Sequence, residues 1–253
     1  MKFCVLASGS KGNCTYIESK KNRILIDMGT TSSQIENKLR EIKVDPKTIN
    51  AIFITHAHTD HISALEIFHK KYKTPVFITE KMKVEGKLRI DNIMNITGMV
   101  ILDELKITPL KTSHDVTDSN GYIIEDGKSS LVYITDTGYI HDRYHEDLKN
   151  KQVYIFESNH DVDKLMNNPK YPYPLKNRIL SAKGHLSNKE ASMYLCKFIG
   201  EETKYVVLAH LSEENNDPEI AISTLRDKLD DYEIEFTNIL AASQDTRTEL
   251  LEV

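Results

Sequence analysis

Four side chains that bind metal ions readily lie within one short run, His56-Ala57-His58-Thr59-Asp60-His61. In an extended backbone, side chains two positions apart point to the same side, so His56 and His58 can converge on one ion. Asp60 and His61 stand where a helical pattern begins and could serve a second ion. Imidazoles and a carboxylate are the ligands expected for zinc, manganese or iron. The run therefore predicts a metal centre; the alternative is a set of surface histidines in a loop.

A second group of candidate ligands is spread along the chain but shares one local setting. Each member comes just after a short β-branched segment, as His56 does, and ligands at strand ends are held more rigidly than ligands in free loops. Combined with the histidine-rich run, these residues favour a site for two metal ions. They are His114, Asp136 and His210.

Strand and helix patterns are mixed along the whole chain. Short β-branched runs predict strands over 3–7, 15–18, 23–27, 51–54, 75–78, 106–110, 122–124, 131–134, 153–156 and 205–208. Helical periodicity predicts helices over 32–41, 62–71, 139–148, 188–199 and 218–232. We therefore expect two sheets packed together with helices outside, in one domain covering residues 1–253. The proline-containing segment 167–183 is predicted to be an ordered, functional loop.

Composition narrows the class of protein. With 253 residues, 40% hydrophobic and 28% charged, the chain has the profile of a soluble globular protein. No stretch approaches the roughly 18 apolar residues of a membrane helix, and the N-terminal apolar run is too short for a signal peptide. Three cysteines without a CxxC spacing predict no disulfide and a cytoplasmic location. The net charge of -5 argues against coating nucleic acid by bulk charge, although bound metal and a local basic strip would still permit a nuclease.

The order of these candidate ligands resembles that of the metallo-β-lactamase fold hydrolases. The shared features are the HxHxDH run, a downstream histidine, an aspartate in Thr135-Asp136-Thr137-Gly138 and a final histidine. The resemblance implies an α/β (α+β) fold, an αββα sandwich of two mixed β-sheets flanked by helices. It also implies two divalent ions per chain, zinc or manganese and possibly iron. One ion would be held by His56, His58 and His114, the other by Asp60, His61 and His210, with Asp136 between them.

Four further segments indicate a branch of that fold. They are ASGSKGN at 7–13, FESNHD at 156–161, YPYPLKNRIL at 171–180 and KGHLSN at 183–188. In this order they look like the YycJ/WalJ-type family of bacterial 5′→3′ exonucleases acting on double-stranded DNA. The resemblance implies phosphodiester hydrolysis at duplex DNA ends, in DNA repair or processing, with repair proteins as possible partners and no membrane.

Other activities of the same fold stay open as alternatives. They are a small-molecule or cyclic-nucleotide phosphodiesterase, an RNA-processing nuclease, and a metal-binding regulator without turnover. The chain is too short for the inserted domain of ribonuclease J, and it shows no obvious arm of the ribonuclease Z kind for gripping transfer RNA.

Three residues are candidates for the proton transfers of phosphodiester cleavage. Asp60 could bind metal and accept a hydrogen bond from the attacking water. His185 is outside the ligand pattern and is the candidate general acid for the leaving oxygen; the alternative is a helix-entry residue with no role. Glu157 ends a strand and could orient His185, unless it is a solvated acid.

Substrate contacts are expected from three places. Ser8, Gly9, Ser10 and Asn13 belong to a small-residue turn that could offer backbone N–H groups to an anion, or could be an ordinary hairpin. Asn159 and His160 are candidates for contacts with phosphate or sugar. Positive charge just before His185 suits a nucleic-acid backbone, although a solvated basic face is the alternative. Its residues are Lys176, Arg178 and Lys183.

Overall fold

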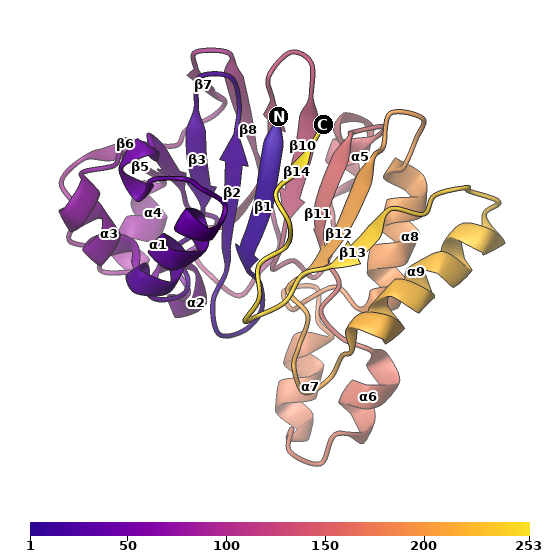
Figure 1. Ribbon diagram of the computed structural model, residues 1–253. Coiled ribbons are helices and arrows are strands. Elements are labelled where there is room, and N and C mark those ends of the chain that lie inside the picture. The colour runs from indigo at the N-terminus through magenta and orange to yellow at the C-terminus, as the bar shows by residue number, and fades with distance from the viewer.

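The computed structural model describes residues 1–253 and contains two seven-stranded sheets that lie face to face (Figure 1). The first sheet has the order β14-β1-β2-β3-β4-β5-β6; β1, β2 and β3 pair antiparallel, and β3 to β6 pair parallel. Its strands are β1 (Lys2–Ala7), β2 (Cys14–Glu18), β3 (Arg23–Ile26), β4 (Ala51–Phe53), β5 (Val76–Ile78), β6 (Ile93–Asn95) and β14 (Leu251–Glu252).

The second sheet has the order β13-β12-β11-β10-β9-β8-β7. Strands β7 to β10 pair antiparallel and β10 to β13 pair parallel, so the predicted pair of mixed sheets is confirmed. Its strands are β7 (Val100–Leu102), β8 (Leu105–Lys111), β9 (Asn120–Glu125), β10 (Ser130–Ile134), β11 (Val153–Glu157), β12 (Tyr205–Ala209) and β13 (Ile239–Ala241).

The strand sequences explain why both faces of each sheet are covered. Side chains alternate across a strand, and in β1 both sets are apolar. Phe3 and Val5 belong to the core between the sheets, whereas Cys4 and Leu6 belong to the core under the helices. A sheet with two apolar faces is stable only when both are covered, which requires the four layers of the αββα sandwich.

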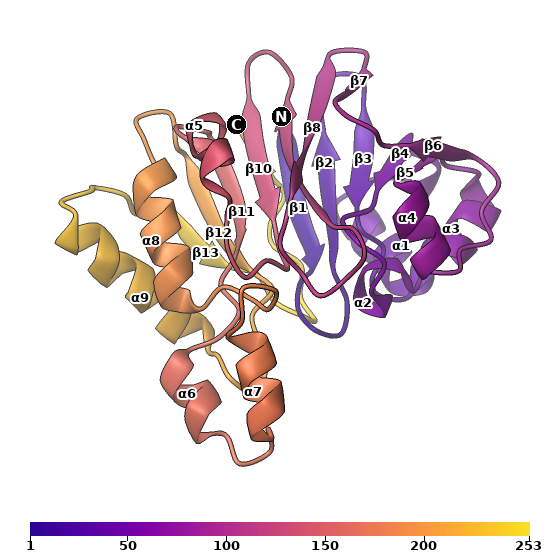
Figure 2. The ribbon, with the colours of Figure 1, turned by 180° about the vertical axis from the view of Figure 1, so that it is seen from behind.

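Helices form the outer layers (Figure 2). Apolar residues of α1 (Ser32–Glu41), α3 (Leu65–Tyr72) and α4 (Glu80–Glu85) pack on the first sheet. Those of α5 (His145–Leu148), α8 (Asn188–Phe198) and α9 (Pro218–Asp231) pack on the second. Helices α1 and α8 begin at capping boxes, which satisfy the otherwise unpaired N–H groups of the first turn.

Two of the five predicted helices are wrong in their extent. The pattern over 62–71 is divided into α2 (Thr59–Ile62) and α3, because Ala64 N–H turns away to donate to Met28 O at 2.9 Å. Over 139–148 the chain forms only the 3-10 turn Asp142–Tyr144 and the short α5. Helix α2 therefore starts earlier than expected and contains Asp60 and His61.

The segment expected to be a loop before His185 is partly helical. Helix α7 (Tyr173–Ile179) lies inside it, and together with α6 (Val162–Asn167) it projects from one end of the sandwich (Figures 1 and 2). Pro174 lies in the first turn of α7, where the missing N–H has no helical partner to lose. We call residues 162–179 the α6–α7 arm; the sequence alone did not predict it.

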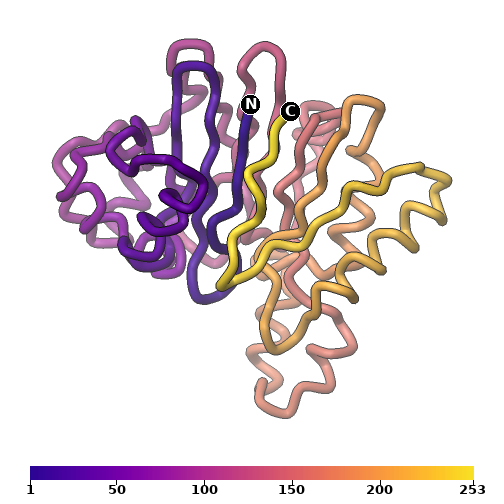
Figure 3. The backbone as a smooth tube through the Cα atoms, viewed as in Figure 1, coloured from indigo at the N-terminus to yellow at the C-terminus, as the bar shows by residue number.

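The two chain ends meet in the first sheet (Figure 3). The Met1 ammonium donates to Val253 O at 2.7 Å, and β14 pairs with β1. Cys4, Cys14 and Cys196 are all free thiols, as predicted. None of the helices has both the length and the apolar character that a bilayer crossing requires.

Candidate metal centre

The candidate ligands gather where strands of both sheets end on the side of the α6–α7 arm. His56 follows β4, Asp136 follows β10 and His210 follows β12. Strands β10, β11 and β12 run parallel, so their carboxyl ends meet at one edge of the sheet. Residues separated by more than 150 positions in the sequence thus share a single pocket.

Each set of residues assigned above to one ion is brought together in space. The ligand atoms of His56, His58 and His114 lie within 4.8 Å of one another, and so do those of Asp60, His61 and His210. Asp136 lies between the sets, with Oδ1 3.8 Å from His114 Nε2 and Oδ2 3.2 Å from His61 Nε2. This spacing fits two neighbouring cations with a shared carboxylate.

The outward ring nitrogens of four histidines are held by polar neighbours. His61 Nδ1 lies 2.8 Å from Asp27 Oδ2, and His210 Nδ1 lies 3.1 Å from Glu157 Oε1. Thr55 Oγ1 contacts His56 Nδ1 at 3.1 Å, and Gly184 O contacts His114 Nδ1 at 3.3 Å. Such partners fix ring orientation and turn Nε2 toward the centre, where His61 Nε2 also lies 3.0 Å from Asn13 Nδ2.

The surroundings of two of those Nε2 atoms show whether a metal ion fits the site. His56 Nε2 and His210 Nε2 are buried, and neither has a hydrogen-bond partner in the protein. A buried nitrogen without a partner is costly unless a cation or proton donor meets it. The residues present therefore fit divalent ions. His58 is turned the other way, with Nδ1 3.3 Å from His114 Nε2 and Nε2 facing Asp115.

The electrostatics of the pocket also favour cations. Burial by itself disfavours a charged imidazole, yet carboxylates around His210, Asp136 foremost, raise its pKa to about 10. The pKa of His61 is raised well above its usual value in the same way, against burial, by Asp27 and Asp136. Burial lowers the pKa of His56 and keeps that imidazole neutral, the form in which it can bind a metal.

Three residues at this edge have a left-handed backbone although none is glycine. They are Asp27 at φ 62°, Asp136 at φ 56° and His210 at φ 56°. Such conformations are uncommon for residues with a side chain and persist where surrounding structure demands them. Here the turn carries Asp136 and His210 from their strand ends into the pocket, and it brings Asp27 against His61.

Asp27 was not singled out from the sequence. It is fully buried after β3, accepts hydrogen bonds from Thr55 N and Oγ1 at 2.8 Å each, and orients His61. The signal available in the sequence was its position at the end of an apolar strand, which it shares with Asp136.

The small-residue turn supports the centre from behind. The carbonyl of Asp60 accepts from Asn13 N at 2.8 Å and from Asn13 Nδ2 at 3.3 Å. Gly29 packs on the same carbonyl so closely that a Cβ there would lie 1.5 Å from it. Asn13 is fully buried and Ser8 is nearly so, with Ser8 Oγ accepting from His210 N. These residues serve the protein interior.

That turn offers little to an anion. Five of its N–H groups donate within the protein, those of Ser8, Gly9, Lys11, Gly12 and Asn13. Ser10 is exposed and is the one member of the turn that lines the pocket. The expected substrate contact from Ser8, Gly9 and Asn13 therefore conflicts with their burial, and Ser10 stays as the candidate.

His185 and Glu157 lie together as expected. Glu157 is fully buried; its Oε1 is 2.8 Å from His185 Nδ1, and its Oε2 accepts from Thr137 N and Leu186 N. Burial would raise the pKa of Glu157, but His185 and His210 outweigh it and lower the pKa to about 2. An ionised Glu157 must accept, so His185 Nδ1 carries the proton. A solvated Glu157 is excluded.

His185 shares its outer carboxylate with the candidate ligand His210. Asp136, Glu157, His185 and His210 also form a group with closely spaced polar atoms. In that group, however, His185 Nδ1 and His210 Nδ1 both face Glu157 Oε1. Those atoms are occupied by hydrogen bonding, which leaves His185 Nε2 for another task.

The pocket in front of the centre has a volume of about 290 Å³. From the α6–α7 arm come Tyr171, Leu175 and Arg178, and from the opposite wall come Ser10 and Ser212. Asn159 also lines it, and its amide donates to His210 O at 2.9 Å.

Three of the other candidate substrate residues lie away from this pocket. His160 is 1% exposed, and burial lowers its pKa to about 4. Lys176 is buried, and its Nζ donates to Met166 O at 2.6 Å, which removes it from solvent and from substrate phosphate. Lys183 is exposed and outside the lining. Of the expected basic strip, only Arg178 lines the pocket, while Lys183 stays exposed beside it in sequence and Lys176 is buried.

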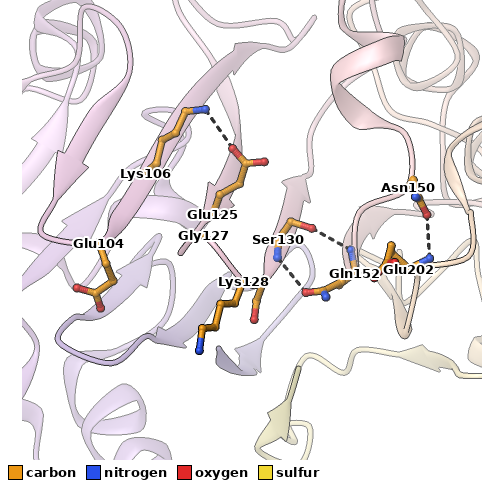
Figure 4. A pocket seen from close by; sticks show the side chains of 10 residues that line it. Glu104, Lys106, Glu125, Gly127, Lys128, Ser130, Asn150, Gln152 and Glu202 are labelled. Atoms are coloured by element: carbon orange, nitrogen blue, oxygen red, sulfur yellow. Dashed lines mark hydrogen bonds and ion pairs between the residues drawn. The ribbon is translucent and has the colours of Figure 1, made fainter.

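A larger cavity, of about 570 Å³, lies at the opposite ends of the strands (Figure 4). Its wall includes Glu104, Lys106, Glu125 and Lys128, and no apolar residue. Lys106 and Glu125, on the neighbouring strands β8 and β9, form an ion pair in its wall. No histidine lines it, so it lacks the imidazole ligands that the metal centre has.

Comparison with known proteins places the chain in a family. The family model of the metallo-beta-lactamase superfamily matches residues 7–185. Exodeoxyribonuclease WalJ of Streptococcus pneumoniae is 34% identical over 100% of this chain and 98% of its own length. Exodeoxyribonuclease YycJ of Bacillus anthracis is 33% identical over 87% of this chain and 86% of its own. The chain belongs to the YycJ/WalJ family of the metallo-beta-lactamase superfamily.

A solved structure agrees at the level of the fold. The metallo-beta-lactamase fold protein YhfI from Bacillus subtilis superposes with a TM-score of 0.70 at 18% identity, covering 98% of each chain. As a member of this superfamily the protein is a hydrolase, and the superfamily fold implies divalent metal ions.

Proposed function

We propose that this YycJ/WalJ-family hydrolase is an exodeoxyribonuclease that degrades double-stranded DNA in the 5′→3′ direction with two divalent metal ions. The observation that carries the proposal is the identity of 33–34% with two exodeoxyribonucleases over nearly the whole chain. The pocket supports it, because it combines a dinuclear set of ligands with a separate histidine and a guanidinium.

The proposed ligands form two sets that share one carboxylate. His56, His58 and His114 would hold one ion, and Asp60, His61 and His210 would hold the other, with Asp136 shared. When bound, a pair of divalent ions lowers the pKa of water and neutralises charge on phosphate oxygens.

Asp60 is proposed to orient the nucleophile as well as to bind metal. Its Oδ2 lies 3.6 Å from His61 Nε2 and 3.8 Å from His210 Nε2, at the mouth of the pocket. His61 and His210 hold the pKa of Asp60 below its usual value despite partial burial, so the carboxylate is an acceptor at neutral pH. A water next to it could donate a hydrogen bond and align for attack.

His185 is proposed to protonate the leaving sugar oxygen from Nε2. Its Nδ1 proton is held by Glu157 at 2.8 Å, which fixes the orientation of the ring and leaves Nε2 facing the pocket. His185 lines the pocket and is not needed as a ligand. Glu157 touches no substrate, so we assign it a positioning role shared between His185 and His210.

A panel of substrates tests the proposal. Purified protein loaded with Mn²⁺ or Zn²⁺ should degrade end-labelled duplex DNA faster than single-stranded DNA, RNA or a chromogenic phosphodiester, and chelation should abolish the activity. Fastest turnover of RNA would favour an RNA-processing nuclease. Turnover restricted to the small substrate would favour a small-molecule phosphodiesterase, and either result would overturn the proposal.

A further inference from the structure

One residue supplies all of the lysine or arginine charge in the pocket. Arg178 on α7 lines it, whereas Lys176 is buried against Met166 O and Lys183 lies outside the lining. The Arg178 side chain is 65% exposed, so packing does little to hold its position. A long, exposed side chain must lose considerable rotamer freedom before it can bind a phosphate productively.

The structure shows what restricts Arg178. Its Nε lies 3.1 Å from Asp115 Oδ2, while the terminal nitrogens bind no protein group. A guanidinium presents five donors in a rigid, planar fork. Contact at Nε therefore uses one edge and leaves the terminal pair, the arrangement that binds phosphate oxygens in a bidentate manner.

Asp115 is itself fixed more firmly than Arg178. Ser113 N donates to Thr137 Oγ1 at 3.0 Å, and Ser113 Oγ donates to Ala182 O at 2.7 Å. Beyond Asp115, Thr117 N donates to the Glu85 carboxylate. The loop that carries Asp115 is thus tied on both sides, and the carboxylate can serve as a fixed point for a mobile arm.

Asp115 contacts the candidate metal ligands as well as the α6–α7 arm. Its Oδ1 lies 3.4 Å from His114 Nε2 and 3.8 Å from His58 Nε2. The contact with Asp115 therefore holds the Arg178 guanidinium next to the candidate ligands. The scissile phosphate of a bound strand, and the phosphate adjacent to it, would lie there.

We infer that Asp115 is a positioning residue for Arg178, which it aims at a backbone phosphate of the DNA strand next to the scissile bond. Asp115 holds Nε, and the terminal nitrogens bind the phosphate. The inference rests on the proposed function, because it presumes a polymer with more than one phosphate. It makes Arg178 a determinant of preference for DNA over a small phosphodiester, which has no second phosphate to bind.

The proposal opposes the prediction from charge alone, which makes it testable. Asp115→Asn removes one negative charge near a DNA-binding surface, so simple electrostatics predicts tighter DNA binding. Loss of positioning predicts weaker binding. Glu214→Gln is the matched control: it removes a carboxylate that pairs with Lys170 of the same arm, at 2.8 Å, but Glu214 does not line the pocket.

The experiment is steady-state cleavage of duplex DNA by metal-loaded protein, with kcat and KM determined separately. Arg178→Ala should raise KM about tenfold, the effect of losing a charge-assisted hydrogen-bond pair. Because Asp115 also contacts His114 and His58, the assays are run at saturating metal, where Asp115→Asn should raise KM about threefold with kcat unchanged. Adding Asp115→Asn to Arg178→Ala should have no further effect, and Arg178→Lys, which lacks the fork, should not restore KM. Glu214→Gln should leave KM at or slightly below that of the wild type.

Three results would overturn the inference. The first is a KM for DNA that Asp115→Asn lowers, as Glu214→Gln does. The second is an effect of Asp115→Asn on KM that is equal with and without Arg178. The third is an Asp115→Asn variant that, at saturating metal, loses kcat and keeps the wild-type KM. Cleavage of a chromogenic phosphodiester separates this from the proposed function. If the wild type cleaves both that substrate and DNA, but Asp115→Asn leaves KM for DNA unchanged, only the positioning role fails. If the wild type cleaves no DNA, the proposed function fails first.

Discussion

Asp136 is the residue on which both proposed metal positions depend. Its Oδ1 lies 3.8 Å from His114 Nε2 of one set and 3.5 Å from His210 Nε2 of the other, and its Oδ2 lies 3.2 Å from His61 Nε2. An asparagine has nearly the same shape but lacks the negative charge and one acceptor oxygen. Asp136→Asn should therefore reduce metal content at both positions, from two equivalents toward none, and lower activity more than about 100-fold.

Elemental analysis after dialysis measures the metal content of Asp136→Asn directly. Asp27→Asn is the comparison variant, with a smaller expected effect. Asp27 contacts His61 but lies outside the centre, so its loss should weaken metal affinity roughly 10–100-fold without changing the stoichiometry at saturating metal. Two tightly held equivalents in Asp136→Asn would contradict the assignment of a shared carboxylate.

His185 should act on the leaving group and not on the metals. His185→Ala should keep its metal content and lose roughly 10²–10⁴ in turnover of DNA, the usual contribution of a positioned general acid. A nitrophenolate leaves without a proton, so a nitrophenyl phosphodiester should be much less affected. Glu157→Gln should show the same preference more weakly, together with some loss of metal, because Glu157 also holds His210. Equal losses on both substrates would make His185 a ligand or a structural residue.

Most of the residues that gather in the pocket could be predicted from sequence because their types and spacing carry the signal. The HxHxDH run and the strand-end His114, Asp136 and His210 are of this kind. Asp27 and Asp115 were missed because an outer carboxylate has no motif of its own; its role depends on which nitrogen it meets. The sequence also did not show which charged side chains are buried. Lys176 is basic, but in the structure its ammonium is bound to a backbone carbonyl.

At the scale of elements, Gly29 tests how α2 is held against the small-residue turn. A Cβ at Gly29 would lie 1.5 Å from Asp60 O and 2.5 Å from Asn13 N. Gly29→Ala should push the start of α2 outward, displace Asp60 and His61, and destabilise the fold by roughly 1–3 kcal/mol. Gly98→Ala, where nothing lies within 4 Å of the added atom, is the matched control. Urea unfolding and metal content should change in the first variant only; an unchanged Gly29→Ala protein would contradict the packing described.

Helices α1 and α3 are tied together by a buried carboxylate. Glu36 on α1 accepts from Lys71 Nζ of α3 at 2.8 Å and from Arg40 Nη2 at 3.0 Å. Burial would raise its pKa, but Lys71 and the other donors outweigh this and lower it. A lowered folded-state pKa gives stability that is present above the unfolded value of about 4.3 and is lost as pH falls below it.

Glu36→Gln should therefore cost about 1 kcal/mol at pH 7, a modest amount because both cations are half exposed. The difference from the wild type should shrink in urea unfolding as the pH is lowered through 4. A gap that persisted or widened in acid would show that Glu36 acts through packing and not through its charge.

The strength of the local pattern decided which elements could be predicted. The ten predicted strands are present to within about two residues, because each has a short run of apolar residues that are mostly β-branched or aromatic. Strands β6, β7, β13 and β14 have three residues or fewer and are partly exposed, whereas the equally short β4 and β5 are fully buried apolar runs. Helix α7 was hidden by Pro172 and Pro174, which are tolerated at a helix start but resemble loop residues in sequence.

At the scale of the whole molecule, the decisive contacts join distant parts of the chain. Strand β14 pairs with β1, and the pocket combines residues of the first sheet with residues from the second sheet and the α6–α7 arm. Local sequence patterns do not contain such pairings, so the two-layer arrangement was predicted but the strand order was not. Tyr171, Leu175 and Arg178 of the arm line the pocket, and the arm projects from one end of the sandwich (Figure 1), so the proposed DNA strand would meet it on entering.

The central claim is metal-dependent removal of nucleotides from a duplex end, and label position tests it most directly. Metal-loaded protein should release a 5′ label from linear duplex DNA at once as a small product, while a 3′ label should pass through a ladder of shortening strands. A covalently closed circular duplex should stay intact, and Asp136→Asn should be inactive on all three. Cutting of the closed circle, or immediate release of the 3′ label with a ladder from the 5′ label, would contradict the account.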